Sequence, residues 1–281
     1  MKSVNQALQE ASASLKSLSG NLARLEAQIL LAHVLHCEKQ NLIYDSKKNL
    51  DTRQLESFAR LTQKRQQGLP LAKIIGTKEF WSLPFKTTQD TLDPRPDTET
   101  LVEAVLEICK DRAKPYKILD LGTGTGCIIL ALLHELPNAK GCGIDFSAQA
   151  LEVASENGQR LGLKGRITWQ LNNWCEGIED EFDIIVSNPP YLSEIEFERL
   201  DNPARFDPKL ALVSGPTGLE CYKKMIPSIN KCLAKGGIFA IEMGIHQEQE
   251  VSKYLSNHGF KIVHIRKDLA TIPRCIVARK N

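Results

Sequence analysis

The feature that most constrains the fold of this chain is a regular alternation of apolar, strand-like runs and helical patterns after residue 116. The strand-like runs cover residues 117–121, 141–146, 167–171, 182–187, 238–243, 261–265 and 275–278. Helical patterns lie between the earlier runs, at residues 127–136, 147–161 and 218–233. Strands that alternate with helices form a parallel sheet covered on both faces. The sequence therefore predicts a doubly wound α/β fold for this part of the chain.

The beginning of the chain has a different pattern. Residues 4–18 and 22–36 carry apolar side chains at every third or fourth position, as amphipathic helices do. Asp51 and Gln54 resemble a capping box that opens a third helix. We therefore expect a small helical domain at residues 1–69.

The helical period disappears at residue 70, and the aromatic residues Phe80 and Phe85 lie in a segment that suggests a short β-hairpin. The sequence Pro-Arg-Pro-Asp at residues 94–97 then stops the chain and starts a helix. These boundaries predict a hairpin linker at residues 70–93 and an α/β domain at residues 94–281.

Composition excludes several classes of protein. Of the 281 residues, 42% are hydrophobic and 25% are charged, which is unlike a disordered or collagen-like chain. The apolar stretches are far shorter than the roughly 20 residues that cross a bilayer. The first residues lack the apolar run of a secretory signal, so we expect a cytoplasmic protein without a membrane partner.

The eight cysteines form no Cys-x-x-Cys pair, so we expect small reduced core residues and no metal site. Charge is uneven along the chain. Residues 1–90 carry 13 Lys and Arg against 8 Asp and Glu, a net of +5, whereas the remaining residues have a net of −3. The basic first part suggests an acidic or nucleic-acid-associated partner, although an ordinary solvated surface would have the same composition.

A glycine-rich turn joins the first strand of the α/β region to the helix after it. Residues 120–126 read Asp-Leu-Gly-Thr-Gly-Thr-Gly, and Cys127 stands where a dinucleotide-binding loop would have its third glycine. Glycines at such a turn let a ligand approach the backbone and the helix N-terminus. Asp145 ends the next strand 19 residues after Gly126, where it can accept hydrogen bonds from ribose hydroxyls. The two features together predict a ligand that contains ribose.

The tetrapeptide Asn188-Pro189-Pro190-Tyr191 directly follows the strand at residues 182–187. Ligands of an open parallel sheet bind beyond the carboxyl ends of its strands, so this motif and the glycine-rich turn should share one crevice. The Asn188 side-chain oxygen and the Pro189 carbonyl can accept the two hydrogens of a planar NH2 group. The prolines stiffen the backbone, and Tyr191 offers a flat face for stacking.

These residues resemble known families. The glycine-rich turn with an acidic strand end is similar to that of class I S-adenosylmethionine-dependent methyltransferases, which have a Rossmann-like sheet, and Asn-Pro-Pro-Tyr resembles their amino-methylating branch. Residues 70–81, 94–99 and 242–247 narrow the resemblance to the PrmC/HemK family. Asp93 and Asp97 depart from that family's usual residues without touching the proposed chemistry.

The resemblance implies an enzyme that methylates the side-chain amide nitrogen of glutamine in the Gly-Gly-Gln motif of peptide-chain release factors. The products would be N5-methylglutamine and S-adenosylhomocysteine. Family cofactor contacts fall on Gly122, Thr123, Gly124, Thr125, Gly126, Asp145, Trp174 and Asn188. Substrate contacts fall on Asn188, Pro189, Pro190 and Tyr191, of which Asn188, Pro189 and Tyr191 are the expected catalytic residues. Phe80 and Arg95 either line the substrate entrance or belong to the hairpin core and a surface ion pair.

Two other functions suit the same motifs. Adenine and cytosine also carry planar NH2 groups, so a DNA or RNA amino-methyltransferase acting at adenine N6 or cytosine N4 is an alternative. The segment after Tyr191 is short and acidic, with Glu194, Glu196 and Glu198, unlike a surface that must cross phosphates. A non-catalytic protein that senses the cofactor is the other alternative, but it would have no use for an intact Asn-Pro-Pro-Tyr.

Overall fold

The computed structural model describes residues 2–200 and 204–280. Contacts divide the chain into two compact units. The first comprises residues up to Gly76 together with a short segment ending at Phe206, and the second comprises the rest. In the described part of the chain, no helix is both long and apolar enough to cross a membrane.

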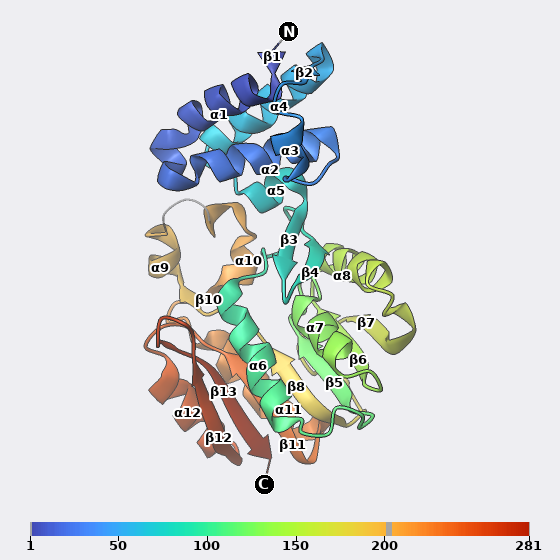
Figure 1. The fold of residues 1–281 in the computed structure, drawn as a ribbon. Coiled ribbons are helices and arrows are strands. Elements are labelled where there is room, and N and C mark those ends of the chain that lie inside the picture. The colour runs from blue at the N-terminus through green and yellow to red at the C-terminus, as the bar shows by residue number, and fades with distance from the viewer. Residues whose placement is uncertain (1, 201–203, 281) are drawn as a thin grey trace. The chain divides into compact units, whose positions relative to one another are not determined.

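The first unit is a small helical bundle (Figure 1). Its elements are β1 (Lys2–Ser3), α1 (Val4–Ser19), α2 (Ala23–Leu35), α3 (Asn41–Tyr44), β2 (Asn49–Leu50), α4 (Thr52–Gln66) and α5 (Leu71–Ile75). Both α1 and α4 begin with a capping box, so the box that Asp51 and Gln54 predict is confirmed. The helix α5 lies where the sequence suggested no helical period, because five residues are too few to show one.

A buried ion pair fixes two helices of this unit. Arg65 on α4 donates from Nε and Nη2 to the two carboxylate oxygens of Glu26 on α2, at 2.9 and 3.0 Å. Glu26 is only 8% exposed. The two-point contact restrains the relative position of the helices, because a bidentate guanidinium–carboxylate pair has a more restricted geometry than a single hydrogen bond.

The second unit contains a doubly wound sheet, and the prediction of an α/β fold is confirmed (Figure 1). The hairpin β3 (Thr77–Phe80) and β4 (Leu83–Lys86) comes first, then α6 (Glu99–Ile108). The sheet strands are β5 (Lys117–Leu121), β6 (Lys140–Asp145), β7 (Ile167–Leu171), β8 (Phe182–Ser187), β11 (Leu233–Glu242), β12 (Phe260–Lys267) and β13 (Pro273–Lys280). The main helices are α7 (Cys127–Glu135), α8 (Ala148–Arg160), α11 (Glu220–Cys232) and α12 (Glu248–Asn257). Shorter elements between β8 and α11 are β9 (Leu192–Ser193), α9 (Glu194–Glu198), α10 (Lys209–Leu212) and β10 (Val213–Gly215).

The order of the sheet is β12-β13-β11-β8-β5-β6-β7. The expected parallel sheet is present except next to one edge, where β13 runs antiparallel to both β11 and β12. The last two strands follow each other through a short turn instead of a helical crossover, and a short connection can only join antiparallel strands.

The hairpin predicted between residues 70 and 93 is confirmed as β3 and β4. Its two-residue turn, Trp81 and Ser82, has φ of +53° and +57°. Positive φ at both central positions is the backbone of a type I′ turn, which matches the twist of the flanking strands.

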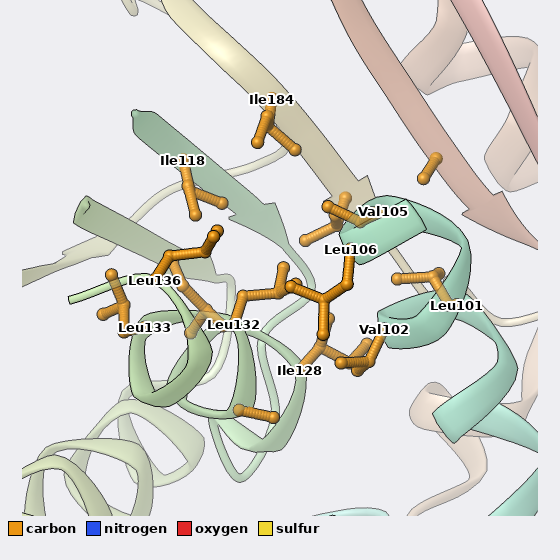
Figure 2. Close-up of a cluster of buried hydrophobic side chains, with 14 of the residues drawn as sticks. Leu101, Val102, Val105, Leu106, Ile118, Ile128, Leu132, Leu133, Leu136 and Ile184 are labelled. Carbon is orange, nitrogen blue, oxygen red and sulfur yellow. The ribbon is translucent and has the colours of Figure 1, made fainter. Parts of the chain in front are cut away.

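Alternate side chains of the central strands point to opposite faces of the sheet, and each face has its own core. Ile118 and Ile184 pack with α6 and α7 on one face, as Figure 2 shows. Leu119 and Ile185 pack with α11 and α12 on the other. The two buried faces explain why these strands read as continuous apolar runs.

None of the eight cysteines forms a disulfide, and six of them are buried, so the prediction that most are core residues is confirmed.

The ring of Trp169 leaves no room for a side chain at Gly143, on the neighbouring strand of the sheet. A Cβ added at Gly143 on β6 would lie 2.3 Å from Trp169 Cζ3. We expect Gly143→Ala to lower the free energy of unfolding by about 3 kcal/mol, the upper range for overpacking a core, because strands on both sides prevent relief. Urea titration measures the loss. Gly165→Ala is the control, since its Cβ would meet no atom within 4 Å, and an equal loss in both variants would contradict the packing argument.

Candidate active site

A crevice lies at the carboxyl ends of β5, β6 and β8 and has a volume of about 680 Å³. Its lining includes six of the residues that the sequence predicted: Gly122, Gly124, Asp145, Trp174, Asn188 and Pro190. The parallel register brings them together, since Leu121 at the end of β5 pairs with Ile144 on β6 and Ser187 on β8. The Ser187 hydroxyl also donates to the Leu121 carbonyl at 2.7 Å.

The glycine-rich turn bends back over the end of β6. The backbone N–H groups of Gly122 and Thr123 both donate to the Ile144 carbonyl, at 2.9 and 2.8 Å. Gly122, Gly124 and Gly126 have φ of +71°, +55° and +78°, a region in which side chains are strained. The ring of Trp174 lies beside the turn, 3.9 Å from where a Cβ of Gly122 would stand.

Asp145 organises the same turn. Its Oδ2 accepts from the Gly124 N–H at 2.9 Å, and its Oδ1 accepts from the Ser147 N–H at 3.0 Å. Burial raises the pKa of Asp145, and these backbone donors act in the opposite direction. Each carboxylate oxygen retains a further lone pair for a ligand hydroxyl.

Asp120 is a second carboxyl group below the turn, and it is completely buried. Its Oδ2 accepts from the Thr123 hydroxyl at 2.7 Å, while its Oδ1 has no hydrogen-bond partner. Burial raises the pKa of Asp120 to about 7. An unpartnered buried carboxyl oxygen lowers the stability of the fold. The contact with Thr123 shows the role of Asp120 here, which is to hold the glycine-rich turn from below.

Three predicted cofactor residues do not line the crevice. Thr123 and Thr125 are 4% and 2% exposed, and Thr123 supports the turn from below through its bond to Asp120. At Gly126 a Cβ would lie 3.0 Å from the Trp169 ring. These residues shape the turn and bring α7 close to its neighbours.

The Asn-Pro-Pro-Tyr motif begins directly after β8, and its residues have different surroundings. Asn188 and Pro190 line the crevice, whereas Pro189 is buried and Tyr191 packs against the α11 side of the sheet. The Tyr191 carbonyl accepts from Gln247 Nε2 at 2.9 Å, and burial raises the pKa of the Tyr191 hydroxyl above its usual value. The amide of Gln247 also contacts the Gly244 N–H and the Tyr222 hydroxyl, so it fixes the backbone of the motif.

Phe80 and Arg95 are the two residues for which the sequence left two roles open, at the substrate entrance or in the fold. Phe80 is 1% exposed and packs edge-on against Phe85 with ring centroids 6.1 Å apart, so it is a core residue and does not line an entrance. Arg95 forms an ion pair with the buried carboxylate of Asp207. Phe80 therefore belongs to the hairpin core, and Arg95 belongs to an ion pair.

Sequence reasoning missed several residues around the crevice. Phe146 is 56% exposed and lines it directly after Asp145, so its position at a strand end was a usable signal. Leu210 on α10 also lines it and is 66% exposed, but a helix of four residues has no recognisable pattern. Thr98 and Glu242 contact Asn188 from distant parts of the chain.

The arrangement defines the class of protein. A glycine-rich turn, an acidic strand end and a mixed sheet ending in an antiparallel strand form the fold of class I methyltransferases. The crystal structure of the ribosomal protein L11 methylase from Lactobacillus delbrueckii subsp. bulgaricus has this fold, with a TM-score of 0.51 and 19% identity. It covers 70% of this chain and 87% of that one.

Sequence comparison narrows the class further. Residues 6–76 match the PrmC N-terminal domain, and residues 113–272 match a methyltransferase domain. The release factor glutamine methyltransferase of Bradyrhizobium diazoefficiens is 39% identical over 283 residues, covering 99% of this chain and 95% of that protein. The one from Rhodospirillum rubrum is 38% identical and covers 92% and 79%. This chain belongs to the release factor glutamine methyltransferase family, and the resemblance seen in the sequence is confirmed.

The raised pKa of Asp120 predicts that this residue makes the free energy of unfolding depend on pH. The native carboxyl holds its proton up to about pH 7, whereas the unfolded one releases it near pH 3.8. Its contribution to stability is therefore present at low pH and lost as pH rises through 7. We expect Asp120→Asn to raise the free energy of unfolding relative to the wild type by about 1–3 kcal/mol at pH 8 and by much less at pH 5. Urea unfolding at both pH values measures the difference, and a pH-independent difference would show that Asp120 does not titrate in this range.

Proposed function

We propose that this chain transfers the methyl group of S-adenosylmethionine to the side-chain amide nitrogen of the glutamine in the Gly-Gly-Gln motif of peptide-chain release factors. The products are N5-methylglutamine and S-adenosylhomocysteine. The observation that carries the proposal is that Asn188 lies in one crevice with the glycine-rich turn and Asp145. The relatives' names supply the substrate class, since they are release factor glutamine methyltransferases.

The residues at the turn fit S-adenosylmethionine. Asp145 has free lone pairs for ribose hydroxyls, Gly122 and Gly124 leave their backbone uncovered, and Trp174 and Phe146 offer apolar surface to the adenine. When bound, S-adenosylmethionine supplies an electrophilic methyl group on a sulfonium.

Asn188 and Pro189 handle the glutamine amide. An amide nitrogen is a poor nucleophile because its lone pair is delocalised, so its orientation determines the rate. The Asn188 side-chain oxygen and the Pro189 carbonyl accept its two hydrogens and stabilise the positive charge that develops on nitrogen. Pro190 lines the crevice and completes the wall against which the substrate side chain packs, while Tyr191 supports the motif from the α11 side of the sheet. No strong base is required, because a methylated, positively charged amide nitrogen loses its proton readily.

The proposal also implies a cytoplasmic reaction, because release factors act on ribosomes there. It requires neither a nucleic acid nor a membrane as direct partner.

Mass spectrometry tests the reaction. The full-length chain is incubated with S-adenosylmethionine and a purified release factor, and the Gly-Gly-Gln peptide is sequenced by fragmentation. We expect one added methyl group on the glutamine side chain, and none on a factor whose glutamine is replaced by alanine. Methylation at another residue, or of adenine or cytosine in added nucleic acid instead, would overturn the proposal.

Asn188→Ala tests the acceptor role. We expect turnover to fall on the order of 10²-fold, the usual scale for losing one preorganised polar group at a transition state. Cofactor affinity, measured by calorimetry, should change much less. The matched control is Asn138→Ala, because Asn138 lies just before β6, at the amino ends of the parallel strands, where its side chain donates to the Ala113 carbonyl at 2.7 Å. Near-normal turnover of Asn188→Ala would remove Asn188 from the mechanism.

We also propose that the first helical unit helps to bind the release factor. The glutamine alone is too small to define a target, and a specific complex typically buries about 800 Å² per partner. Residues 1–90 carry the excess of positive charge, and α3 exposes Ile43 and Tyr44, at 69% and 87%. Exposed aromatic and aliphatic side chains of this kind are common anchors of interfaces.

Removal of the first unit should separate binding from chemistry. We expect a chain that begins at Thr77, shown by circular dichroism to be folded, to retain cofactor binding but lose most of its kcat/KM on an intact release factor. Its rate on a short Gly-Gly-Gln peptide should equal that of the full-length chain, because the peptide does not use the missing surface. Unchanged kcat/KM on the intact factor would show that the first unit does not bind it.

A further inference from the structure

Two buried side chains from distant segments meet the amide of Asn188. Thr98 ends the short 3-10 helix Pro96–Thr98, and its Oγ1 lies 3.1 Å from Asn188 Nδ2. Glu242 ends β11, and both Thr98 and Asn188 are in hydrogen-bonding contact with its carboxyl group. Thr98 and Glu242 are each only 2% exposed. Asn188 itself is half-buried and lines the crevice.

The chemistry of these groups fixes the direction of the hydrogen bonds. Asn188 presents its NH2 group to the Thr98 oxygen, which accepts from Nδ2. The one proton of the Thr98 hydroxyl is then left to donate to the Glu242 carboxyl group. A reversed Asn188 amide would place its oxygen against the Glu242 carboxylate. The NH2 group therefore faces Thr98 and Glu242, and the amide oxygen remains for the crevice.

The buried carboxyl group of Glu242 lowers the stability of the fold, so a purely structural role does not account for it. Its Oε2 has no hydrogen-bond partner, and burial raises the pKa of its carboxyl group to about 7. Arg274 and Asp97 also act on this carboxyl group, in opposite directions. A partly satisfied buried carboxyl group weakens a fold relative to a well-packed apolar side chain.

We infer that Thr98 and Glu242 are positioning residues that hold the Asn188 side-chain oxygen toward the substrate amide. The inference rests on the proposed function, in which that oxygen accepts a hydrogen of the glutamine NH2 group. Neither residue touches the substrate. Both act by preventing the Asn188 amide from rotating by half a turn, which would offer the substrate a donor in place of an acceptor.

Substitutions at Thr98 test the inference in the full-length chain. Thr98→Val removes the hydroxyl at nearly constant volume, and Thr98→Ser retains it. With a release factor and S-adenosylmethionine as substrates, we expect Thr98→Val to lower kcat about tenfold, the effect of one lost hydrogen bond, with little change in the KM for S-adenosylmethionine. Thr98→Ser should restore most of kcat. Thr100→Val is the packing control, because Thr100 is also a buried threonine and lies two residues later in α6; this substitution should leave kcat unchanged.

A double-mutant cycle separates positioning from a structural role. In the Asn188→Ala background, Thr98→Val should have no further effect on kcat, because the group that it positions is absent. Glu242→Gln should behave like Thr98→Val, since a glutamine amide has donors as well as an acceptor and tolerates either orientation of Asn188. Equal losses from Thr98→Val in both backgrounds would overturn the inference.

A second measurement does not depend on activity. In proton–nitrogen NMR spectra, the Asn188 side-chain NH2 signal is identified by its loss in Asn188→Ala. We expect this signal to shift and to exchange faster with solvent in Thr98→Val and Glu242→Gln than in the wild type or Thr98→Ser. An unchanged signal would overturn the positioning role. If the wild type transferred no methyl group to the release factor, the proposed function would fail, while the NMR comparison would still decide whether the two residues orient Asn188.

Discussion

The parallel pairing of β5 with β8 is the constraint on which the site depends. Leu121 pairs with Ser187, so the glycine-rich turn and Asn188 leave the sheet at the same level. The bond from the Ser187 hydroxyl to the Leu121 carbonyl connects the two strands at that point. Because side chains alternate along a strand, a shift of one residue would exchange the two cores of the sheet. The separate apolar clusters on its faces therefore hold the register, and the register positions the reacting groups.

Much of this arrangement could be predicted from the sequence, because its signals are local. The bounds of β5 and β8 agree with the apolar runs, since these strands are buried on both faces and flanked by polar turns. The bounds of β7 also agree, although it is an edge strand and largely exposed. The helix α12 was missed because Val251 and Leu255 are its only fully buried residues, too few for a clear period. The direction of β13 was missed because an apolar run does not show which way its strand points.

The contacts of the site were harder to predict for a different reason. Gly122, Asp145 and Asn188 each follow a strand, so one rule about the carboxyl ends of parallel strands brings them together. No such rule relates Thr98, at the start of a helix, to Glu242, at the end of a strand. Their meeting at Asn188 depends on how α6 packs on the sheet. Phe80 shows the same limit, since its aromatic character suits a core and a binding surface equally well, and only its burial decides.

Two buried carboxyl groups beside the crevice are only partly satisfied. Asp120 on β5 and Glu242 on β11 each have one buried oxygen without a hydrogen-bond partner, and these two strands flank β8, which Asn188 directly follows. Burial raises the pKa of both to about 7. Two such groups lower stability, yet each holds a neighbour in one orientation: Thr123 under the glycine-rich turn, and Asn188 through Thr98. The site must align a weak nucleophile with an electrophilic carbon, and misalignment of the two lowers the reaction rate strongly. A domain of this size can lose a few kcal/mol of its free energy of unfolding and stay folded. Fixed orientation of the reacting groups therefore outweighs the loss of stability.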